Sequence, residues 1–287
     1  MEIKDFIVFI LTHGRPDNVI TYKSLRRHGY TGKVYLIIDN EDDKAGEYYK
    51  NYPGEVIMFD KLVVSKEFDE MDNFNDRRAI VYARNACFGI AKELGYTYFL
   101  ELDDDYTSFD YRTDGELTYG EHQLGIKNID AIFKSMLNFY KKIPAKSIAM
   151  AQGGDFIGGS ENGFAKDIKL RRKCMNSFFC STERVFKFVG RINEDVNTYT
   201  HAASIGDLFF TVPIVSLTQK STQSNSGGMT DIYLDNGTYI KSFYTVMLSP
   251  SSVKISMMGD KHRRLHHMVA WNNAIPVILN QKYKKTA

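Results

Sequence analysis

Several features are scarce in this chain of 287 residues, and each absence excludes a class of protein. The three cysteines, Cys87, Cys174 and Cys180, lack metal-ligand spacing, and so few cysteines fit a reducing cytoplasm. No apolar run reaches the length of a transmembrane helix, and the N-terminus has no basic segment followed by an apolar one. We therefore expect a cytoplasmic protein without a membrane partner.

The charge balance also lacks an excess of either sign. The formal net charge is +2, so any contact with DNA or RNA has to come from local basic patches. We find no internal repeat, low-complexity tract or linker, and we therefore expect one domain over residues 1–287.

Apolar runs alternate with helical patterns over the first 105 residues. The runs at 6–11, 33–38, 55–59 and 96–102 predict buried strands, and helices are expected between them, near 17–28, 46–50 and 76–94. This alternation is typical of a doubly wound parallel sheet, so the predicted fold class is α/β with a mostly parallel central sheet flanked by helices.

The pattern is less regular after residue 105. We expect an irregular segment, then a helix near 126–142, strands at 147–151, 178–181, 211–217 and 253–257, and helices over 182–188 and 201–210. Residues 219–230 indicate a mobile loop or lid, and residues 240–248 fit a helix or a strand equally. The glycine-rich segment 152–160 is not a phosphate-binding P-loop, because no Gly-Lys-Ser/Thr follows it.

Three consecutive carboxylates, Asp103, Asp104 and Asp105, follow the fourth predicted strand. Ligands bind at the carboxyl ends of strands in open α/β sheets. Adjacent anions repel one another, and oxygen ligands without a nearby cysteine select a hard cation, Mg²⁺ or Mn²⁺, which normally carries substrate phosphates as well. A solvated acidic turn is the other interpretation.

Further polar residues interrupt or follow the early elements. Arg15 lies with helix N–H donors after the first strand, which suits a nucleotide, although a plain strand-to-helix turn has the same pattern. Asp39 ends the second strand and is a candidate for bonding a ribose or base edge. Arg84 breaks the apolar face of a predicted helix, and a salt bridge on the helix surface is its simplest explanation.

Two later groups could complete a reactive site. Glu194 and Asp195 follow a glycine turn, and His262, His266 and His267 cluster near the C-terminus. A carboxylate can take the proton from an attacking hydroxyl, an imidazole can complete a metal's coordination sphere, and the cation can offset charge on a departing nucleoside diphosphate. The set predicts metal-assisted group transfer from a nucleotide-activated donor. Acidic residues in the first turn of a helix would also explain the carboxylate pair.

The motifs, in this order, resemble the GT-A glycosyltransferase fold. The segments THGRPDN, FLELDDDY and GRINEDVNTY further resemble the phage and kinetoplastid glycosyltransferases that decorate hydroxymethylated pyrimidines in DNA. That group includes the base J glucosyltransferase and the glycosyltransferases associated with TET/JBP-type oxygenases. The resemblance covers roughly residues 6–200.

The resemblance implies a single GT-A catalytic domain, with a nucleotide-sugar-binding half at residues 1–105 and an acceptor-binding half at residues 106–287. Asp103 and Asp105 match the DxD motif that holds the metal and the donor phosphates. Asp104 would meet the donor ribose or sugar, or face solvent. Asp195 matches the catalytic base of inverting enzymes, with Glu194 contacting acceptor or donor.

The remaining roles that the resemblance implies concern the donor, the metal and the DNA. Thr12, Arg15 and Asp39 match positions that hold the nucleoside, and Arg84 would approach the donor sugar or phosphates. One C-terminal imidazole would be the third metal ligand; His262 is the first candidate and His266 the second. Contacts to DNA phosphates would come from six basic residues, Lys169, Arg171, Arg172, Lys173, Arg263 and Arg264. A solvated surface is the usual interpretation of such basic runs.

The implied reaction moves a sugar from a UDP-sugar, most simply UDP-glucose, to the hydroxymethyl group of 5-hydroxymethyluracil or 5-hydroxymethylcytosine in DNA, with inversion and with Mn²⁺ or Mg²⁺. The acceptor base has to leave the stack to reach a buried catalyst. For a phage-encoded protein the compartment would be the host cytoplasm. Three alternatives stay open: a GT-A enzyme with a glycan acceptor, a nucleotidyltransferase, and a non-catalytic nucleic-acid-binding module.

Overall fold

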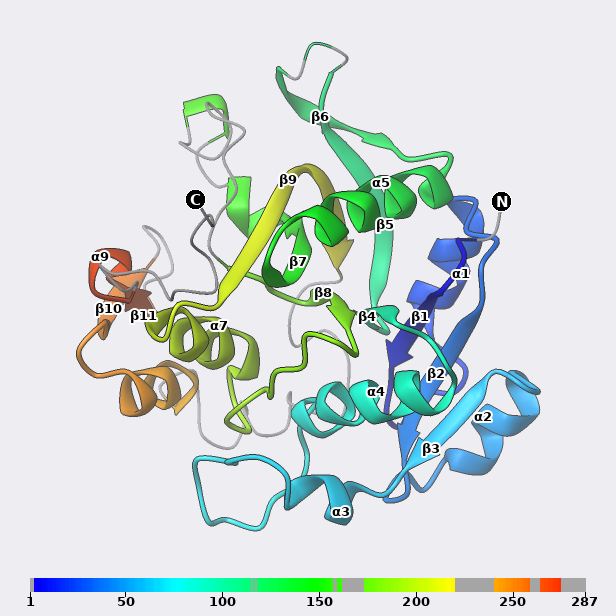
Figure 1. Ribbon diagram of the computed structural model, residues 1–287, viewed down its shortest axis with the longest axis horizontal. Helices are drawn as coiled ribbons and strands as arrows, with labels where there is room; N and C mark the ends of the chain where they lie inside the picture. The colour runs from blue at the N-terminus through cyan, green and yellow to red at the C-terminus, as the bar shows by residue number, and fades with distance from the viewer. Residues whose placement is uncertain are drawn as a thin grey trace, which may run out of the picture.

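The computed structural model describes residues 3–114, 116, 118–156, 159–161, 173–219, 240–258 and 264–274. Its first half consists of strands β1 (Phe6–Leu11), β2 (Val34–Asp39), β3 (Val56–Phe59) and β4 (Tyr98–Asp103), joined by helices α1 (Ile20–Arg27), α2 (Ala45–Asn51), α3 (Lys61–Ser65) and α4 (Val81–Glu93). The four strands are parallel and lie in the order β3-β2-β1-β4 (Figure 1). The predicted alternation is therefore confirmed, and the three aspartates follow the fourth strand.

The second half extends the same sheet with mixed strand directions. It adds β5 (Tyr106–Thr113), β6 (Tyr119–Gly125), α5 (Ile129–Lys142), β7 (Ala145–Gln152), the short 3₁₀ turns η1 (Gly153–Phe156) and η2 (Gly159–Glu161), β8 (Ser177–Ser181), α7 (Glu194–Ser204) and β9 (Leu208–Gln219). The full order is β3-β2-β1-β4-β8-β7-β9-β5-β6, with β8 antiparallel to β4 and β9 parallel to β7.

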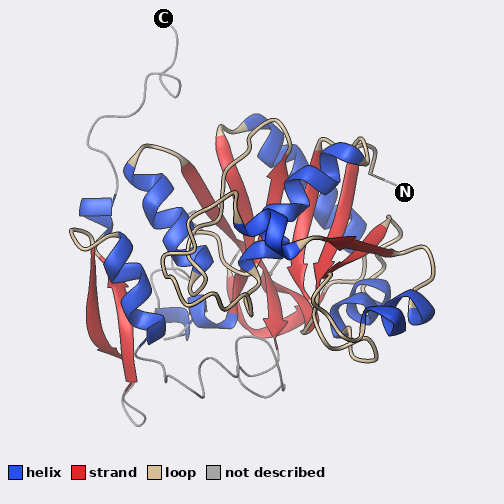
Figure 2. Ribbon diagram, turned by 90° about the horizontal axis from the view of Figure 1, so that it is seen from below, coloured by secondary structure: helices blue, strands red, loops and turns tan. Residues whose placement is uncertain are grey.

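A third group of elements lies beside α7. It comprises a helical segment at residues 240–248, the antiparallel pair β10 (Val253–Met258) and β11 (Arg264–Val269), and α9 (Trp271–Ala274). The pair forms its own two-stranded sheet and stands apart from the main sheet at one end of the molecule (Figure 2). None of the described helices is long and apolar enough to cross a bilayer.

Two apolar layers cover the two faces of the main sheet. Alternate residues of β1 divide between them: Phe6, Val8 and Ile10 pack with α1, α2 and α5, whereas Ile7 and Phe9 pack with α4 and α7. A strand buried on both faces reads as a continuous apolar run, because neither set of side chains meets water. The sheet is thus the middle layer of a helix–sheet–helix arrangement.

The sheet curls so that the end of β4 meets the start of β5. Only Asp104 and Asp105 separate these strands, although β8, β7 and β9 lie between them in the sheet order. In a flat sheet the two strands would be about 19 Å apart, more than two residues can span. The curl occurs in β9, where the pairing with β7 jumps from Val212 to Ser216 around Pro213, which has no N–H to donate. Beyond this bulge β9 also pairs with β5.

Several predictions for the second half are wrong. The segment expected to be irregular after Asp105 forms β5 and β6, and residues 182–188 are not helical. The helix expected at 201–210 ends at Ser204, and the rest of that range begins β9. The strand expected at 211–217 is the middle of β9, which begins at Leu208, inside the range expected to be helical. Residues 240–248 are helical, which resolves that alternative, whereas residues 220–230 of the expected lid lie outside the described residues.

Candidate active site

Asp104 is the most deeply buried of the three consecutive aspartates, with 5% of its surface exposed. Its carboxylate accepts hydrogen bonds from Thr12 Oγ1 at 2.7 Å and from Arg15 Nη1 at 3.0 Å. Because the Thr12 hydroxyl donates to Asp104, it accepts from the Tyr48 hydroxyl at 2.9 Å, which in turn accepts from the Arg15 backbone N–H at 2.7 Å. Burial raises the pKa of Asp104, against the effect of Arg15 and Thr12. The structure therefore brings Thr12, Arg15 and Asp104 together, and the solvent-facing interpretation of Asp104 is wrong.

Asp105 presents an oxygen that the protein leaves without a donor. Its Oδ2 accepts a hydrogen bond from Gln219 Nε2 at 3.2 Å, but its Oδ1 is buried with no hydrogen-bond partner among the described residues. Burial and then the charges of Asp103 and Asp104 raise the pKa of Asp105 to about 7. A buried carboxylate oxygen beside two other anions suits a divalent cation, so this donor set fits the metal that the DxD motif implies. Within the described ranges, no group of three or more His, Cys, Asp and Glu side chains is placed to hold a metal ion. A cation at Asp105 would therefore need further ligands.

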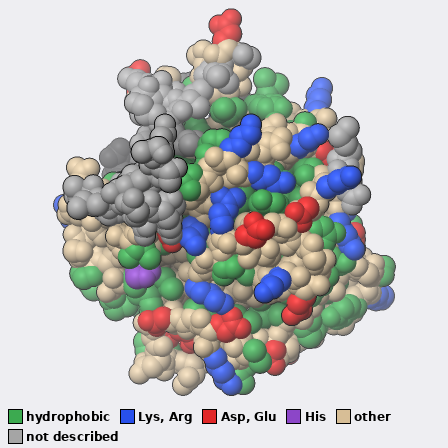
Figure 3. Space-filling view, in the orientation of Figure 1, with side chains coloured by type: hydrophobic (Ala, Val, Ile, Leu, Met, Phe, Trp, Pro, Cys, Tyr) green, Lys and Arg blue, Asp and Glu red, His purple; other side chains and the backbone are tan. Residues whose placement is uncertain are grey.

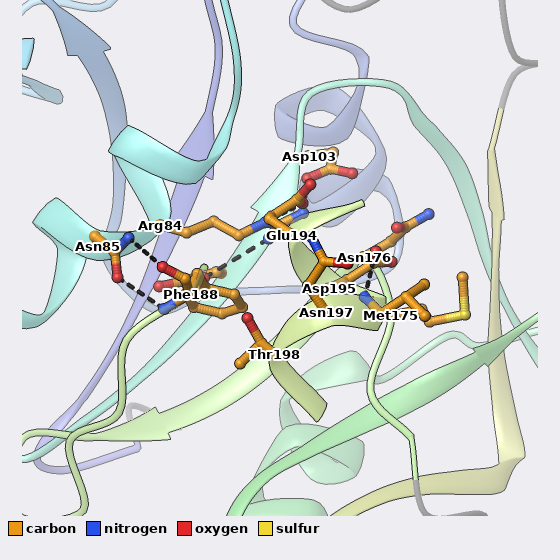
Figure 4. A network of polar contacts seen from close by, with 12 residues as sticks. Arg84, Asn85, Asp103, Met175, Asn176, Phe188, Glu194, Asp195, Asn197 and Thr198 are labelled. Atoms are coloured by element: carbon orange, nitrogen blue, oxygen red, sulfur yellow. Dashed lines mark hydrogen bonds and ion pairs between the residues drawn. The ribbon is translucent and has the colours of Figure 1, made fainter. Parts of the chain in front are cut away.

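Asp103 is joined to the first turn of α7 through Arg84. The Arg84 guanidinium on α4 donates from Nη2 to Asp103 Oδ1 at 2.9 Å and from Nε to Glu194 Oε1 at 3.0 Å, as Figure 4 shows. Its Nη1 lies 3.7 Å from Glu101 Oε2, and the guanidinium stacks over Phe178 at 4.8 Å from the ring centroid. With 1% of its surface exposed, Arg84 lies inside the protein, so the helix-surface salt bridge is wrong.

The acids around Arg84 are held in a desolvated setting. Burial raises the pKa of Glu101 to about 8 and that of Asp103 to about 6, although the neighbouring Arg84 cation works against both shifts. Burial and the adjacent Asp195 likewise raise the pKa of Glu194. For Arg84 burial disfavours the charge, but Asp103, Glu194 and Glu101 together raise its pKa above its already high value. The cation is therefore permanent, and its removal would expose three acids to one another.

The predicted catalytic pair occupies the first turn of α7. Asn193 precedes it in a left-handed conformation with φ of 57°, and Glu194 and Asp195 are the first two helical residues. Acidic side chains are favoured there because the N-terminus of a helix carries partial positive charge. Gly190 makes the preceding turn possible: its φ is +79°, and a Cβ there would lie 2.4 Å from the side-chain nitrogen of Asn197. The first-turn interpretation is therefore confirmed, and it leaves the catalytic role of the pair open.

Asp39 lies at the end of β2, beside the end of β1. Lys61 Nζ is 3.2 Å from its Oδ2, and His13 Nδ1 is 2.8 Å from the same atom. Although burial opposes the shift, the His13 hydrogen bond and the Lys61 charge lower the pKa of Asp39. Its hydrogen bond to Asp39 raises the pKa of His13, which is 42% exposed on its side chain. The sequence interpretation missed His13 and Lys61, although His13 directly follows Thr12 in the same loop.

Most of the residues predicted to contact DNA, and the predicted metal ligand His262, are not among those that the structure describes. His262, Lys169, Arg171, Arg172 and Arg263 lie outside the described residues, as does the side chain of Arg264, which begins β11. The Lys173 ammonium pairs with Asp155. On the face seen in Figure 3, lysine and arginine side chains are mixed with acidic ones, in keeping with the small net charge.

Among the described residues, His267 is an imidazole that contacts the turn before Glu194 and Asp195. Its Nδ1 lies 3.3 Å from Asn193 Nδ2, directly before the acidic pair, and burial lowers its pKa to about 3. The ring of His266 lies 4.2 Å from that of His267, centroid to centroid. The expected metal ligands are His262 and then His266; His262 lies outside the described residues, and the role of His266 stays a prediction.

A protein-family model described as TET-Associated Glycosyltransferase matches residues 6–228. The chain belongs to this family. The match confirms the resemblance seen in the motifs, and it makes the protein an enzyme, a glycosyltransferase. No protein with a curated description matches the chain. For a TET-associated glycosyltransferase, the polar edge formed by the ends of β1, β2 and β4 and the start of α7 is the candidate active site.

Proposed function

We propose that this protein is a metal-dependent, inverting GT-A glycosyltransferase. Its donor would be a UDP-sugar, with UDP-glucose expected, and its acceptor the hydroxymethyl group of 5-hydroxymethyluracil or 5-hydroxymethylcytosine in DNA. Family membership supports the class of reaction. The observation that carries the donor site is Asp105 Oδ1, a buried carboxylate oxygen at the carboxyl end of β4 for which the described part of the chain supplies no hydrogen-bond donor.

The donor would bind along the strand ends. Asp103 and Asp105 would hold Mn²⁺ or Mg²⁺, and the cation, when bound, offsets the charge that develops on the departing UDP. Thr12 and Arg15 lie beside Asp104, and Asp39 ends the adjacent strand, so these residues would position the nucleoside. Their shared edge is the usual place for a nucleotide in an open α/β sheet.

The acceptor would be activated from α7. Asp195 would take the proton of the acceptor hydroxyl while that oxygen attacks the anomeric carbon and the bond to UDP breaks. Glu194 would stay ordered beside it, since Arg84 holds its carboxylate at 3.0 Å. In this assignment Arg84 acts through Asp103 and Glu194, because its buried guanidinium is already bound by both.

The DNA acceptor rests on the family's association with TET enzymes and on the basic residues. The target base would be extruded from the duplex, and Lys169, Arg171, Arg172, Lys173, Arg263 and Arg264 would contact phosphates. Lys173 would have to exchange its partner Asp155 for a phosphate. The net charge of +2 favours a second candidate, a GT-A enzyme with a glycan acceptor. Such an enzyme would show no salt-sensitive binding to DNA.

One experiment tests these assignments together. The purified protein is incubated with Mn²⁺, a panel of UDP-sugars and DNA that contains hydroxymethylated pyrimidines, and the digested nucleosides are weighed by mass spectrometry. We expect the mass gain of one sugar on the hydroxymethylated base, lost in Asp103→Ala and Asp105→Ala. UDP-sugar hydrolysis without a mass gain on any DNA would refute the DNA acceptor and retain the donor site. No sugar transfer and no UDP-sugar hydrolysis by the unaltered protein, together with DNA binding that is unchanged in both variants, would instead support the non-catalytic module.

A further inference from the structure

The turn that leads into the catalytic helix is held by a segment that lies outside the family match. The match ends at residue 228, whereas the segment comprises residues 240–258 and 264–274, which we call the C-terminal clamp. Figure 1 shows the helix at 240–248 and the pair β10–β11 beside α7. The turn itself consists of residues 190–193, directly before Glu194 and Asp195.

Asn193 makes the closest polar contacts with the clamp. Its side-chain Nδ2 donates to the Lys241 carbonyl at 2.6 Å and lies 3.3 Å from both Thr245 Oγ1 and His267 Nδ1. A residue that precedes a helix normally bonds its side chain to the helix's own free N–H groups. Asn193 makes no such bond, so its side-chain amide binds the clamp and does not cap α7.

The neighbouring residues of the turn meet the same segment. Arg191 Nε donates to Asp72 Oδ2 at 2.9 Å, and the Tyr244 hydroxyl donates to that same carboxylate oxygen. Ile192 packs against Tyr244 in a small apolar cluster of its own. Each residue of the turn from Arg191 to Asn193 is therefore fixed, directly or through Asp72, by the helix at 240–248.

Aromatic packing adds a contact further along α7. Tyr199 stacks on Trp271 of α9, with ring centroids 5.7 Å apart and planes 23° from parallel. By contrast, the described contacts of Asp104 and Asp105 come from Thr12, Arg15 and Gln219. The clamp thus holds the acidic pair of α7, whereas other elements hold Asp104 and Asp105, and Asp103 shares Arg84 with Glu194.

We propose that the C-terminal clamp sets the position of Glu194 and Asp195 for the transfer step, with Asn193 as the positioning residue. This inference rests on the proposed function for its kinetic readout. The clamp controls the rate of transfer more than the affinity for the sugar donor, because it contacts the turn before α7 and none of the residues that hold Asp104 and Asp105. Its link to the remaining donor carboxylate, Asp103, passes through Glu194 and Arg84.

The decisive variant is Asn193→Gly. Glycine keeps the left-handed backbone but removes the amide, so the clamp contact is lost without new backbone strain. We expect kcat for transfer to fall about 10–100-fold, as for a displaced catalytic group, with the KM for UDP-sugar within about twofold of the unaltered protein. Asn193→Asp, which also tolerates the conformation but replaces the donor nitrogen with an oxygen, should show the same loss. Asn75→Gly is the matched control, since Asn75 has φ of 55° and is exposed, and it should leave both constants unchanged.

Hydrogen–deuterium exchange separates failure of this inference from failure of the proposed function. In Asn193→Gly, the backbone amides of residues 194–200 should exchange at least about tenfold faster than in the unaltered protein and in Asn75→Gly. If no acceptor is glycosylated by the unaltered protein but this exchange difference is present, the proposed function is refuted and the clamp stands. If exchange and kcat both match the unaltered protein, the clamp is refuted. A rise in the donor KM equal to the fall in kcat would also overturn it, since that indicates general damage.

Discussion

Replacing Arg84 with glutamine tests the central charge arrangement of the protein. The substitution Arg84→Gln removes one cation and leaves three acids, Glu101, Asp103 and Glu194, around a neutral amide. Arg84 connects α4, on which it lies, to β4 and to α7, whose Glu194 is 110 positions further along the chain. The free energy of unfolding should therefore fall even without any ligand or substrate.

The magnitude follows from the burial of Arg84. Breaking a buried ion pair by removing one partner costs about 3–5 kcal/mol, and Arg84 is too deeply buried for water to screen the remaining acids. We expect the free energy of unfolding to fall by about that amount and the midpoint of thermal unfolding by roughly 10 °C. Arg84→Lys keeps a cation, but an ammonium group cannot reproduce the separate bonds to Asp103 and Glu194. It should cost about 1.5–3 kcal/mol.

The assay is equilibrium urea unfolding followed by circular dichroism near pH 7, and Glu101 supplies the control. Both of its carboxylate oxygens lack a hydrogen-bond partner among the described residues, and its pKa is raised to about 8. Glu101→Gln alone should therefore change stability by less than about 1 kcal/mol. The double variant Arg84→Gln/Glu101→Gln should lose about as much stability as Arg84→Gln alone, because without the cation the pKa of Glu101 rises further and its side chain is already neutral near pH 7.

Two outcomes would refute this reasoning. If Arg84→Gln lowers the free energy of unfolding by less than about 1 kcal/mol, the guanidinium does not neutralise the buried acids. If Glu101→Gln costs as much as Arg84→Gln, the Glu101 carboxylate is a required partner of the cation, contrary to its missing hydrogen bonds.

Three further predictions concern other residues. Asn85→Ala should lower the free energy of unfolding by about 2–4 kcal/mol in urea titrations, because the Asn85 amide satisfies both the backbone N–H and the carbonyl of buried Phe188, at 2.9 and 3.0 Å. The ion pair of His13 and Asp39 stabilises the fold fully between pH 3.8 and pH 6.5, the ordinary pKa values of Asp and His, because the pKa of Asp39 is lowered and that of His13 is raised. This stabilisation is lost as the pH rises through the raised pKa of His13. His13→Gln should therefore cost more stability near pH 6 than near pH 9, and an equal cost at both would contradict the pairing. Gly190→Ala should lower the midpoint of thermal unfolding by several degrees, because its Cβ would lie 2.4 Å from a neighbouring nitrogen at a φ of +79°; a midpoint within 1 °C of the original would argue against this crowding.

The strand-end residues were predictable because simple rules govern parallel sheets. The apolar runs at 6–11 and 96–102 indicate buried strands of one parallel sheet, and the carboxyl ends of parallel strands share one edge. The pairing of β1 with β4 is known only from the structure. That rule alone places Thr12 and Arg15 near Asp104, which the hydrogen bonds confirm. Glu101 was also a usable signal, because a charged residue within a buried strand needs a partner.

The partners of these residues could not be read from the sequence. Arg84 and Glu194 are 110 positions apart, and no periodicity connects a helix interior with the first turn of another helix. Gln219, the donor to Asp105, is the last residue of β9, although its sequence places it in the mobile loop or lid expected at 219–230. Contacts of this kind depend on the order and curl of the strands, which side-chain patterns within one segment do not encode.

The curl of the main sheet also imposes an order of assembly on the site. β9 occupies the position between β7 and β5, and of the strands that the structure describes in that sheet it comes last along the chain. Until β9 is synthesised, β5 has no neighbour on that side and Asp105 has no Gln219 to bond it. A nascent chain can therefore build the parallel half early, but the three aspartates reach their final arrangement only after residue 219 has left the ribosome.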